Sequence, residues 1–168
     1  MLMLFACLPA IARAQGDYPL KASLVARLMQ YTTWPEDKLK PGAPFVIGVI
    51  GQGSDISDRI KENTVRGYKG REVVVKVFTA QEEIAGCCVL FVSSSELSRQ
   101  HQIVREANRR NVLTFGETSS FDDDGGIITF IQEDGHLKFT VSDENRKKAR
   151  LKISAAIFEL NLYKGGAK

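Results

Sequence analysis

Apolar residues near the start of the chain repeat with the period of an α-helix. Four of them recur at steps of four, four and three, which places them on one helix face. They are Leu20, Leu24, Leu28 and Tyr31. Asp17 can cap this helix, with Pro19 in its first turn. We expect it to end at Trp34-Pro35, because the residue before a proline avoids the helical region.

Continuous apolar runs alternate with helical patterns through the middle of the chain. Such runs are typical of strands that are buried on both faces of a sheet. The alternation predicts parallel pairing through right-handed crossovers. The predicted strands are residues 45–50, 72–78, 87–92 and 112–115, and the predicted helices are residues 54–62 and 95–109.

The pattern changes in the last part of the chain. Residues 126–132 and 136–142 are strand-like, and Glu133-Asp134-Gly135 between them is typical of an antiparallel hairpin. Asp143 then caps a last helix, which Gly165-Gly166 ends. Its inward residues are Ala149, Ile153, Ala156, Ile157 and Leu160. We expect a single α/β domain with a mixed, mainly parallel sheet of about six strands flanked by helices, and a C-terminal antiparallel hairpin.

The N-terminus has the pattern of a secretory signal peptide. Met1 to Ile11 is almost wholly apolar and too short to span a bilayer, and Ala12-Arg13-Ala14 is a small-x-small cleavage pattern. We expect residues 1–14 to be removed on export and residues 15–168 to form the domain. A basic region before the apolar run is missing, which allows a true start upstream of Met1. A frayed N-terminus on a cytosolic protein stays open as the alternative.

Length and charge narrow the range of functions. With 168 residues, the chain is long enough for one domain with a substantial core. Its net charge of +3 is too small to favour nucleic acid as a partner. The basic residues are spread along the chain, apart from a cluster over residues 146–152.

Cys87 and Cys88 are the cysteines that would remain after export, and they are adjacent. Neighbours on a strand point to opposite faces, so a disulfide between them would be strained. The sequence has no C-x-x-C pair and no second cysteine cluster for zinc. We therefore expect two free, buried and inert thiols.

Gly51-Gln52-Gly53 follows the first apolar run, as in a dinucleotide-binding turn. The third small residue of that motif is replaced by Ile56, which would crowd the contact between helix and strand. Phe78-Thr79-Ala80 stands where an acidic residue should hold the ribose. A plain turn is the better interpretation, and we expect no cofactor.

The other candidate catalytic or metal-binding residues are equally weakly supported. His101 and His136 are expected on the surface, away from any triad or metal site. Asp122-Asp123-Asp124 lacks the alternate spacing of a calcium loop and is expected to be a solvated turn. Ser93-Ser94-Ser95 has no nucleophile elbow around it, and Ser95 is explained as a helix cap. We therefore expect a protein that is not an enzyme and holds no metal.

Four stretches, taken in order, resemble the YfiR family of periplasmic proteins. The first is YPLKASLVARLMQYTTWP and the second is FVIGVIGQGS. The third is CCVLFVSSSE. The fourth, FDDDGGIITFIQEDGHLKFTVSDENRKKARLKISAAIFEL, is the most specific, with a Gly-Gly hairpin, an alternating strand and Ala-Arg-Leu-x-Ile-Ser. The resemblance covers nearly the whole of the chain after the signal peptide.

The resemblance implies a regulator. Such proteins bind the periplasmic part of an inner-membrane diguanylate cyclase and hold it off, which lowers cyclic-di-GMP and biofilm formation. The resemblance also implies an outer-membrane lipoprotein that sequesters the repressor, and a homodimer. The family often pairs a cysteine at position 87 with one on the first strand, where Val46-Ile47-Gly48-Val49 has none. A second family disulfide has no counterpart near Gly125-Gly126.

The residues that bind a partner or ligand are less defined than the family. We select Trp34, together with Arg146, Lys147 and Lys148 on the last helix. Trp34 can instead anchor the first helix in the core, and the three basic residues can form a solvated helix face. Two other functions stay open. One is an extracytoplasmic sensor that binds a small molecule beside Trp34 or at the strand ends, and the less favoured one is a nucleotide-dependent enzyme.

Overall fold

A computed structural model describes residues 17–52 and 54–159. Its centre is a six-stranded sheet in the order β3-β2-β4-β5-β6-β7. The first five strands in this order are parallel, and β7 pairs antiparallel with β6. The strands are β2 (Phe45–Ile50), β3 (Val73–Phe78), β4 (Val89–Val92), β5 (Leu113–Gly116), β6 (Ile128–Glu133) and β7 (His136–Val141). The expected mixed α/β sheet with its late hairpin is confirmed.

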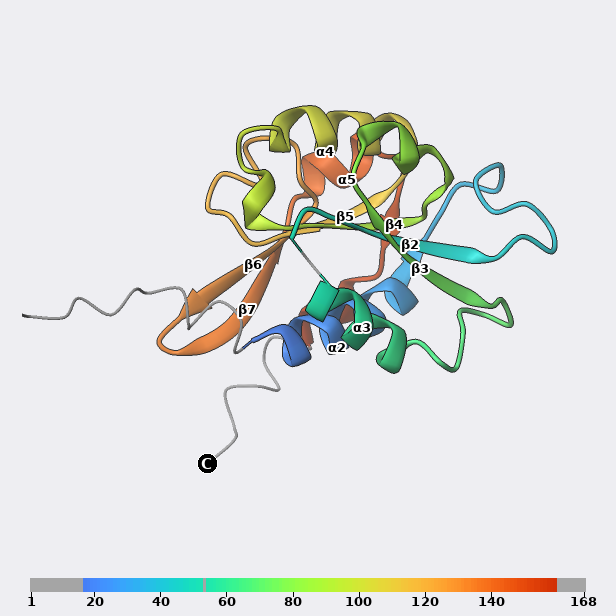
Figure 1. Ribbon diagram of the computed structural model, residues 1–168, viewed down its shortest axis with the longest axis horizontal. Helices are drawn as coiled ribbons and strands as arrows, with labels where there is room; N and C mark the ends of the chain where they lie inside the picture. Colours follow the sequence, from blue (N-terminus) through green and yellow to red (C-terminus); the bar gives the residue numbers. More distant parts are fainter. Residues whose placement is uncertain (1–16, 53, 160–168) are drawn as a thin grey trace, which may run out of the picture.

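Helices cover both faces of the sheet, as Figure 1 shows. Helices α2 (Tyr18–Leu28) and α3 (Ser54–Asn63) lie on one face, and α4 (Gln100–Arg109) and α5 (Asp143–Lys148) lie on the other. The described residues also form the short 3-10 turns η1 (Met29–Tyr31), η2 (Gln81–Gly86), η3 (Ser94–Glu96) and η4 (Ala155–Phe158).

Two hydrophobic clusters fill the space between the sheet and these layers. Along β4, Val89 and Phe91 belong to the cluster under α2 and α3, whereas Leu90 and Val92 belong to the cluster under α4. This is the alternation that the period of a strand requires. All four side chains are fully buried, which explains the unbroken apolar run in the sequence.

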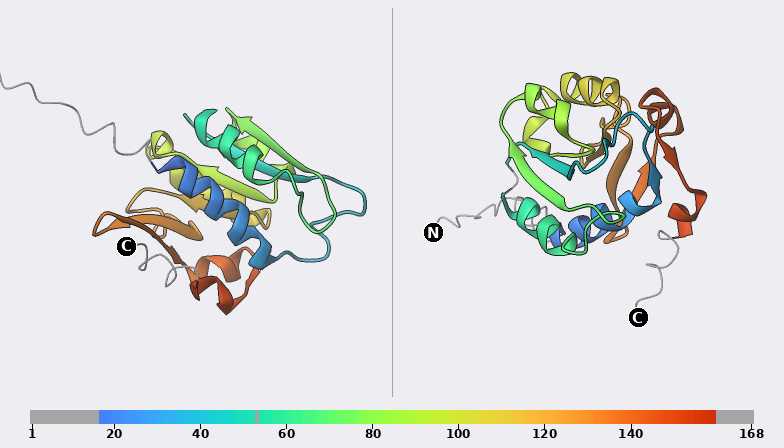
Figure 2. Two further views of the ribbon diagram at one scale, coloured as in Figure 1. Left: turned by 90° about the horizontal axis from the view of Figure 1, so that it is seen from below. Right: turned by 90° about the vertical axis from the view of Figure 1, so that its right-hand side faces the viewer.

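The expectation of one long last helix is wrong. Helix α5 ends at Lys148, and Arg150 takes a left-handed backbone conformation with φ of 56°. The chain then forms β8 (Lys152–Ile153), which pairs antiparallel with β1 (Thr32–Thr33) away from the main sheet (Figure 2). Pairing with the distant strand β1 replaces the helical hydrogen bonds that were expected here. No local residue pattern indicates this pairing. Leu160, the last expected inward residue, lies outside the described residues.

The other boundaries differ from expectation by a few residues. Helix α2 ends at Leu28, and its expected last turn becomes η1 followed by β1. The helix expected from Ser95 begins at Gln100. Ser95 lies within η3, whose cap is Ser93: the Ser93 side chain accepts from the backbone N–H of Ser95. Ser142 is likewise the N-cap of α5, in place of Asp143.

Candidate functional site

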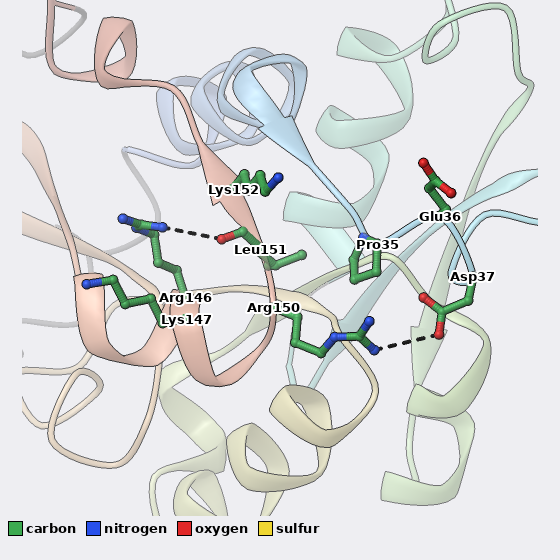
Figure 3. Close-up of a pocket in the computed structure, with 8 residues that line it drawn as sticks. All are labelled: Pro35, Glu36, Asp37, Arg146, Lys147, Arg150, Leu151 and Lys152. Carbon is green, nitrogen blue, oxygen red and sulfur yellow. Dashed lines mark hydrogen bonds and ion pairs between the residues drawn. The ribbon is translucent and has the colours of Figure 1, made fainter.

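A surface groove of about 710 Å³ runs beside the β1–β8 pair (Figure 3). It is lined by the residues after β1, the end of α5 and the start of β8. These are Pro35, Glu36, Asp37, Arg146, Lys147, Arg150, Leu151 and Lys152. The volume is within the range of small-molecule sites in proteins.

The groove is lined by more basic than acidic side chains. Arg150 lies 3.6 Å from the Asp37 carboxylate across the opening. Arg146 donates to the carbonyl oxygen of Leu151 at 3.4 Å. Within α5, Lys147 donates to Asp143 and, together with Arg146, holds the pKa of that carboxyl below its usual value. An acidic or mixed-charge surface is the best electrostatic match for this rim.

The backbone around Arg150 is what brings these charges together. The left-handed turn lets the backbone N–H of Leu151 donate to the carbonyl of Arg146 at 2.9 Å. The side chain of Asn111 donates to the carbonyl of Ala149 at 3.0 Å and ties this turn to the loop before β5. The backbone N–H of Ser154 donates to the carbonyl of Tyr31, which fixes the other end of the segment.

The structure separates the basic residues that the sequence grouped. Arg146 and Lys147 line the groove. Lys148 pairs with Glu144 at 2.7 Å and lines a second hollow that it shares with His101 and Asn108. Sequence reasoning missed Arg150 and Lys152 as groove residues. Their charge was visible in the chain, but the helix expected there would have placed them on other turns.

Trp34 is buried in the core beside the groove. The residue is 6% exposed, and its indole meets the rings of Phe45 and Tyr68 edge-on, with centroids 5.1 Å and 5.6 Å away. Its Nε1 donates to the carbonyl of Cys88 at 3.1 Å. Trp34 therefore fastens β1 to the start of β4, while its neighbour Pro35 reaches the groove.

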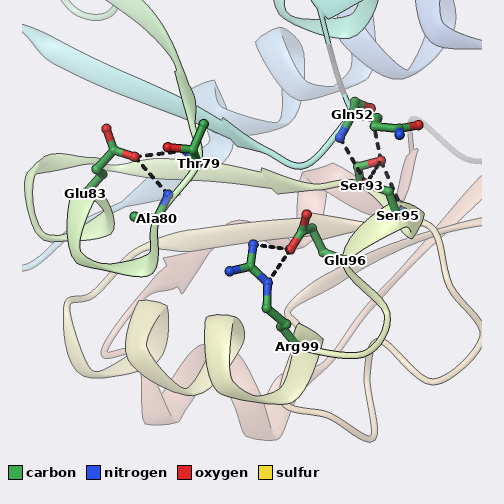
Figure 4. A network of polar contacts seen from close by, with 8 residues as sticks. All are labelled: Gln52, Thr79, Ala80, Glu83, Ser93, Ser95, Glu96 and Arg99. Carbon is green, nitrogen blue, oxygen red and sulfur yellow. Dashed lines mark hydrogen bonds and ion pairs between the residues drawn. The ribbon is translucent and has the colours of Figure 1, made fainter.

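A second place to look for a site is the carboxyl end of the parallel strands. β2 and β4 are neighbours, and the crossover after β2 leads to β3 on one side whereas the crossover after β4 leads to β5 on the other; ligands of open α/β sheets bind at such points. The Ser93 hydroxyl donates to the carbonyl of Gln52 at 3.1 Å, and the Gln52 N–H donates to Ser95 at 2.9 Å (Figure 4). At Gly51, whose φ is 98°, a Cβ would lie 2.6 Å from the Ser95 hydroxyl. The two loops thus contact each other directly; Gly53 lies outside the described residues.

Charged side chains complete this end of the sheet. Lys21 pairs with Glu117 at 2.6 Å, with both side chains 7% exposed. The other oxygen of Glu117 accepts from the backbone N–H of Ser94 at 3.1 Å. Burial, and then the charges of Glu117 and Asp55, raise the pKa of Tyr18 beside this pair. These groups satisfy one another, and the arrangement fixes α2 against the strand ends.

The remaining candidate residues have structural contacts or face solvent. His101 and His136 are exposed. Asp124 accepts from the Gln100 amide at 2.7 Å, and Asp122 accepts from the Asn145 amide at 3.0 Å, so these two carboxylates brace the turn before β6. Within residues 17–52 and 54–159, no group of three or more His, Cys, Asp or Glu side chains could hold a metal ion.

Both expected thiols are free and buried. Cys88 belongs to the cluster under α2 and Cys87 to the one under α4, so they point to opposite faces as expected. Burial raises the pKa of Cys87 to about 12 and also raises the pKa of Cys88. Both thiols are therefore protonated at neutral pH, which makes them poor nucleophiles.

Solved structures share this fold at low sequence identity. One is described as a conserved domain protein from Vibrio cholerae, with a TM-score of 0.55 and 11% identity over 84% of this chain. Another is described as an ABC domain in complex with L-Trp from Streptococcus pneumonia, with a TM-score of 0.52 and 12% identity over 82% of this chain. This chain spans 58% of the length of each of them. They support the α/β architecture alone.

Similarity in sequence identifies a family for this chain, whereas similarity in fold identifies the architecture alone. No curated protein matches the chain at a significant level. In the part of the chain that the structure describes, no helix is long and apolar enough to cross a membrane. A family model described as YfiR/HmsC-like matches residues 18–161, from the start of α2 to beyond η4. This match takes in all four stretches on which the resemblance rests, and the chain therefore belongs to the YfiR/HmsC-like family.

Proposed function

We propose that this protein binds and represses an inner-membrane diguanylate cyclase, and so lowers cyclic-di-GMP and biofilm formation. Membership of the YfiR/HmsC-like family indicates a periplasmic regulator of cyclic-di-GMP signalling. The identity of the enzyme as the direct target, and the direction of the effect, are the further steps that we propose. A repressor of this kind binds the inactive state of its target better than the active state, and shifts the equilibrium by that difference alone.

The observation that best supports a binding role is the groove beside the β1–β8 pair. Its rim presents Arg146, Lys147, Arg150 and Lys152, and its acidic lining residues are Glu36 and Asp37, while Asp143 pairs with Arg146 and Lys147 on α5. Lys152 has no ion pair among the described residues, and Arg150 is paired only at 3.6 Å and is largely exposed. Such charges are available to an incoming partner at little cost. We propose that the cyclase presents an acidic or mixed-charge segment to this rim.

The other selected residues have distinct parts in this proposal. Lys148 lies on the far side of α5 from the groove, where it would extend the basic surface. Trp34 would act from within the core, by holding the start of the segment from Pro35 to Asp37 in place. The signal peptide proposed for residues 1–14 lies outside the described residues, and export is required for contact with a periplasmic target. An outer-membrane lipoprotein that sequesters the repressor completes the proposal.

The test begins with deletion of the gene, which should raise cyclic-di-GMP and surface attachment. Supplying the protein to the periplasm should reverse both, and a cytosolic copy should not. A triple charge reversal at Arg146, Lys147 and Lys148 should fail to restore repression, and so should Arg150→Glu alone. The matched control reverses Arg59, Lys61 and Arg66, which are exposed on and after α3. Thermal unfolding of each purified variant shows whether it is folded.

The experiment distinguishes a wrong binding surface from a wrong function. If the α3 control and the groove variants repress equally well, the groove is not the binding surface. If deletion leaves cyclic-di-GMP unchanged, the repressor proposal fails as a whole.

A second candidate function is an extracytoplasmic small-molecule sensor. The observation that favours it is the groove volume of about 710 Å³, together with a neighbour in fold that is described as holding L-Trp. A ligand that binds the folded state alone raises the melting temperature by mass action. Thermal shift against free amino acids, with L-Trp among them, tests this candidate. A shift that Arg150→Glu abolishes, without any change in cyclic-di-GMP on deletion, would favour the sensor over the repressor.

A further inference from the structure

Strand β3 has one open edge. It is the outermost strand of the main sheet, and within the described residues it pairs with β2 alone (Figure 2). Its sequence is Val-Val-Val-Lys-Val-Phe, and the first five residues are partly or largely exposed, with Val77 at 48%. A strand of this length that leaves apolar side chains in solvent is a template for pairing with another strand.

The direction of its free hydrogen-bonding groups follows from the β2 ladder. The backbone N–H of Phe45 donates to the carbonyl of Glu72 at 2.8 Å, and Phe45 stands in register with Val73. In a parallel ladder the groups of alternate residues point to the same neighbour. The backbone groups that bond to β2 are therefore those of Glu72, Val74 and Lys76. The groups that point outward, away from β2, are those of Val73, Val75 and Val77.

The exposed charges of this segment are arranged symmetrically. Glu72 and Lys76 are both exposed, and Val74 lies midway between them on the same face of the strand. Neither charge has an ion pair among the described residues within 4.0 Å. If a second copy of this strand ran antiparallel with Val74 opposite Val74, Glu72 of each copy would face Lys76 of the other. Because a two-fold axis relates the two copies, this contact between Glu72 and Lys76 forms twice.

We propose that β3 is a self-association edge, at which two copies pair antiparallel about Val74. The hydrogen bonds agree with this register, because Val73 then stands opposite Val75 of the second copy and both have outward backbone groups. The Val74 pair becomes a non-hydrogen-bonded pair, in which side chains approach most closely. Moving the axis to Val75 would put Lys76 opposite Val74 and lose both ion pairs. A lysine on an edge strand usually discourages pairing, but here Glu72 compensates its charge.

The first experiment is a charge swap followed by sedimentation of the purified protein over a range of concentrations. Wild type should dimerise reversibly. Lys76→Glu sets Glu72 against a carboxylate in two places and should weaken the dimer about tenfold or more, since two attractive cross-strand charge pairs become repulsive. Glu72→Lys should weaken it similarly. The double variant with both substitutions should restore the dimer, and the matched control Arg105→Glu on exposed α4 should leave it unchanged.

The second experiment reads the register directly. Val74→Cys brings two cysteines opposite each other in the proposed pair, with their Cα atoms about 4.5 Å apart. This separation allows a disulfide to form. The variant should form a covalent dimer on mild oxidation. Val75→Cys, which would face Val73 of the second copy, should cross-link far less, and wild type should not cross-link, because Cys87 and Cys88 are buried.

A wild-type protein that stays monomeric up to about 100 µM would overturn the proposal. So would a dimer that ignores both charge reversals and does not cross-link through Val74→Cys, because that dimer would use another face. Neither readout involves cyclic-di-GMP, so the proposal stands or falls independently of the proposed function.

Discussion

The Lys21 ammonium and the Glu117 carboxylate form a buried ion pair, with 2.6 Å between nitrogen and oxygen and both side chains 7% exposed. The pair joins α2 to the residue that follows β5, and the second carboxylate oxygen of Glu117 holds the N–H of Ser94. Helix α2 is therefore fixed to the carboxyl ends of two strands at once. Each charge is tolerated in the interior because the other is present.

Removing one member of this pair should be costly. Lys21→Met should lower the free energy of unfolding by about 3–5 kcal/mol, because it leaves the Glu117 carboxylate buried without its partner. Combining it with Glu117→Gln should recover part of the loss, since no charge then stays buried. Urea unfolding measures both. The matched control is Lys61→Met, whose pair with Asp58 is exposed and should contribute less than ~1 kcal/mol. Equal effects at Lys21 and Lys61 would contradict the ranking by burial.

Trp34 should stabilise the fold in two separable ways. Trp34→Phe keeps most of the ring packing and removes the hydrogen bond to the Cys88 carbonyl, which still accepts from the N–H of Leu113. A loss of about 1 kcal/mol is expected. Trp34→Ala empties the space beside Phe45 and Tyr68 and should cost about 3–5 kcal/mol. Circular dichroism during unfolding measures both. A Trp34→Ala protein of normal stability that has lost ligand binding would instead make this indole a binding residue.

Reducing agents should leave the stability unchanged. Cys87 and Cys88 are free in the folded protein, so no bridge exists for a reductant to break. The melting temperatures measured with and without dithiothreitol should coincide. A drop equivalent to several kcal/mol, the usual size for a native disulfide, would reveal a bridge that this fold does not contain.

Alkaline pH should destabilise the protein through Cys87. Burial raises the pKa of this thiol from 9.0 to about 12, so the folded state keeps its proton at a pH where the unfolded state has lost it. Its contribution to stability is complete below pH 9 and is lost as the pH rises toward 12. The free energy of unfolding, measured at intervals from pH 8 to pH 11, should fall more steeply in wild type than in Cys87→Ala. Parallel pH profiles would assign the fall to other groups.

Export should leave a shortened chain in the periplasm. The apolar start and the Ala12-Arg13-Ala14 pattern predict cleavage after Ala14. Mass spectrometry of the protein isolated from its host should find an N-terminus near Gln15. An intact Met1 in the cytosolic fraction would contradict both the signal peptide and the proposed periplasmic target.

The central sheet could be predicted because its signals are local. β2 and β4 are apolar runs bounded by turn residues, and burial on both faces requires such runs. The hairpin of β6 and β7 is marked by Asp134-Gly135, where both residues take positive φ values as a tight turn needs. The free state of Cys87 and Cys88 followed from the geometry of neighbouring residues on a strand.

The candidate groove could be predicted only in part. The charge of each side chain, and the helix that carries Arg146 and Lys147, follow from local residue patterns. That Arg150 and Lys152 join these two residues, opposite Asp37, depends instead on long-range strand pairing. The reason is that β8 exists through its pairing with β1, which brings Ile153 to Thr32 from the far end of the chain. A strand of two residues has too little local pattern to outweigh a helical spacing, so its presence depends on a partner that the surrounding sequence does not reveal.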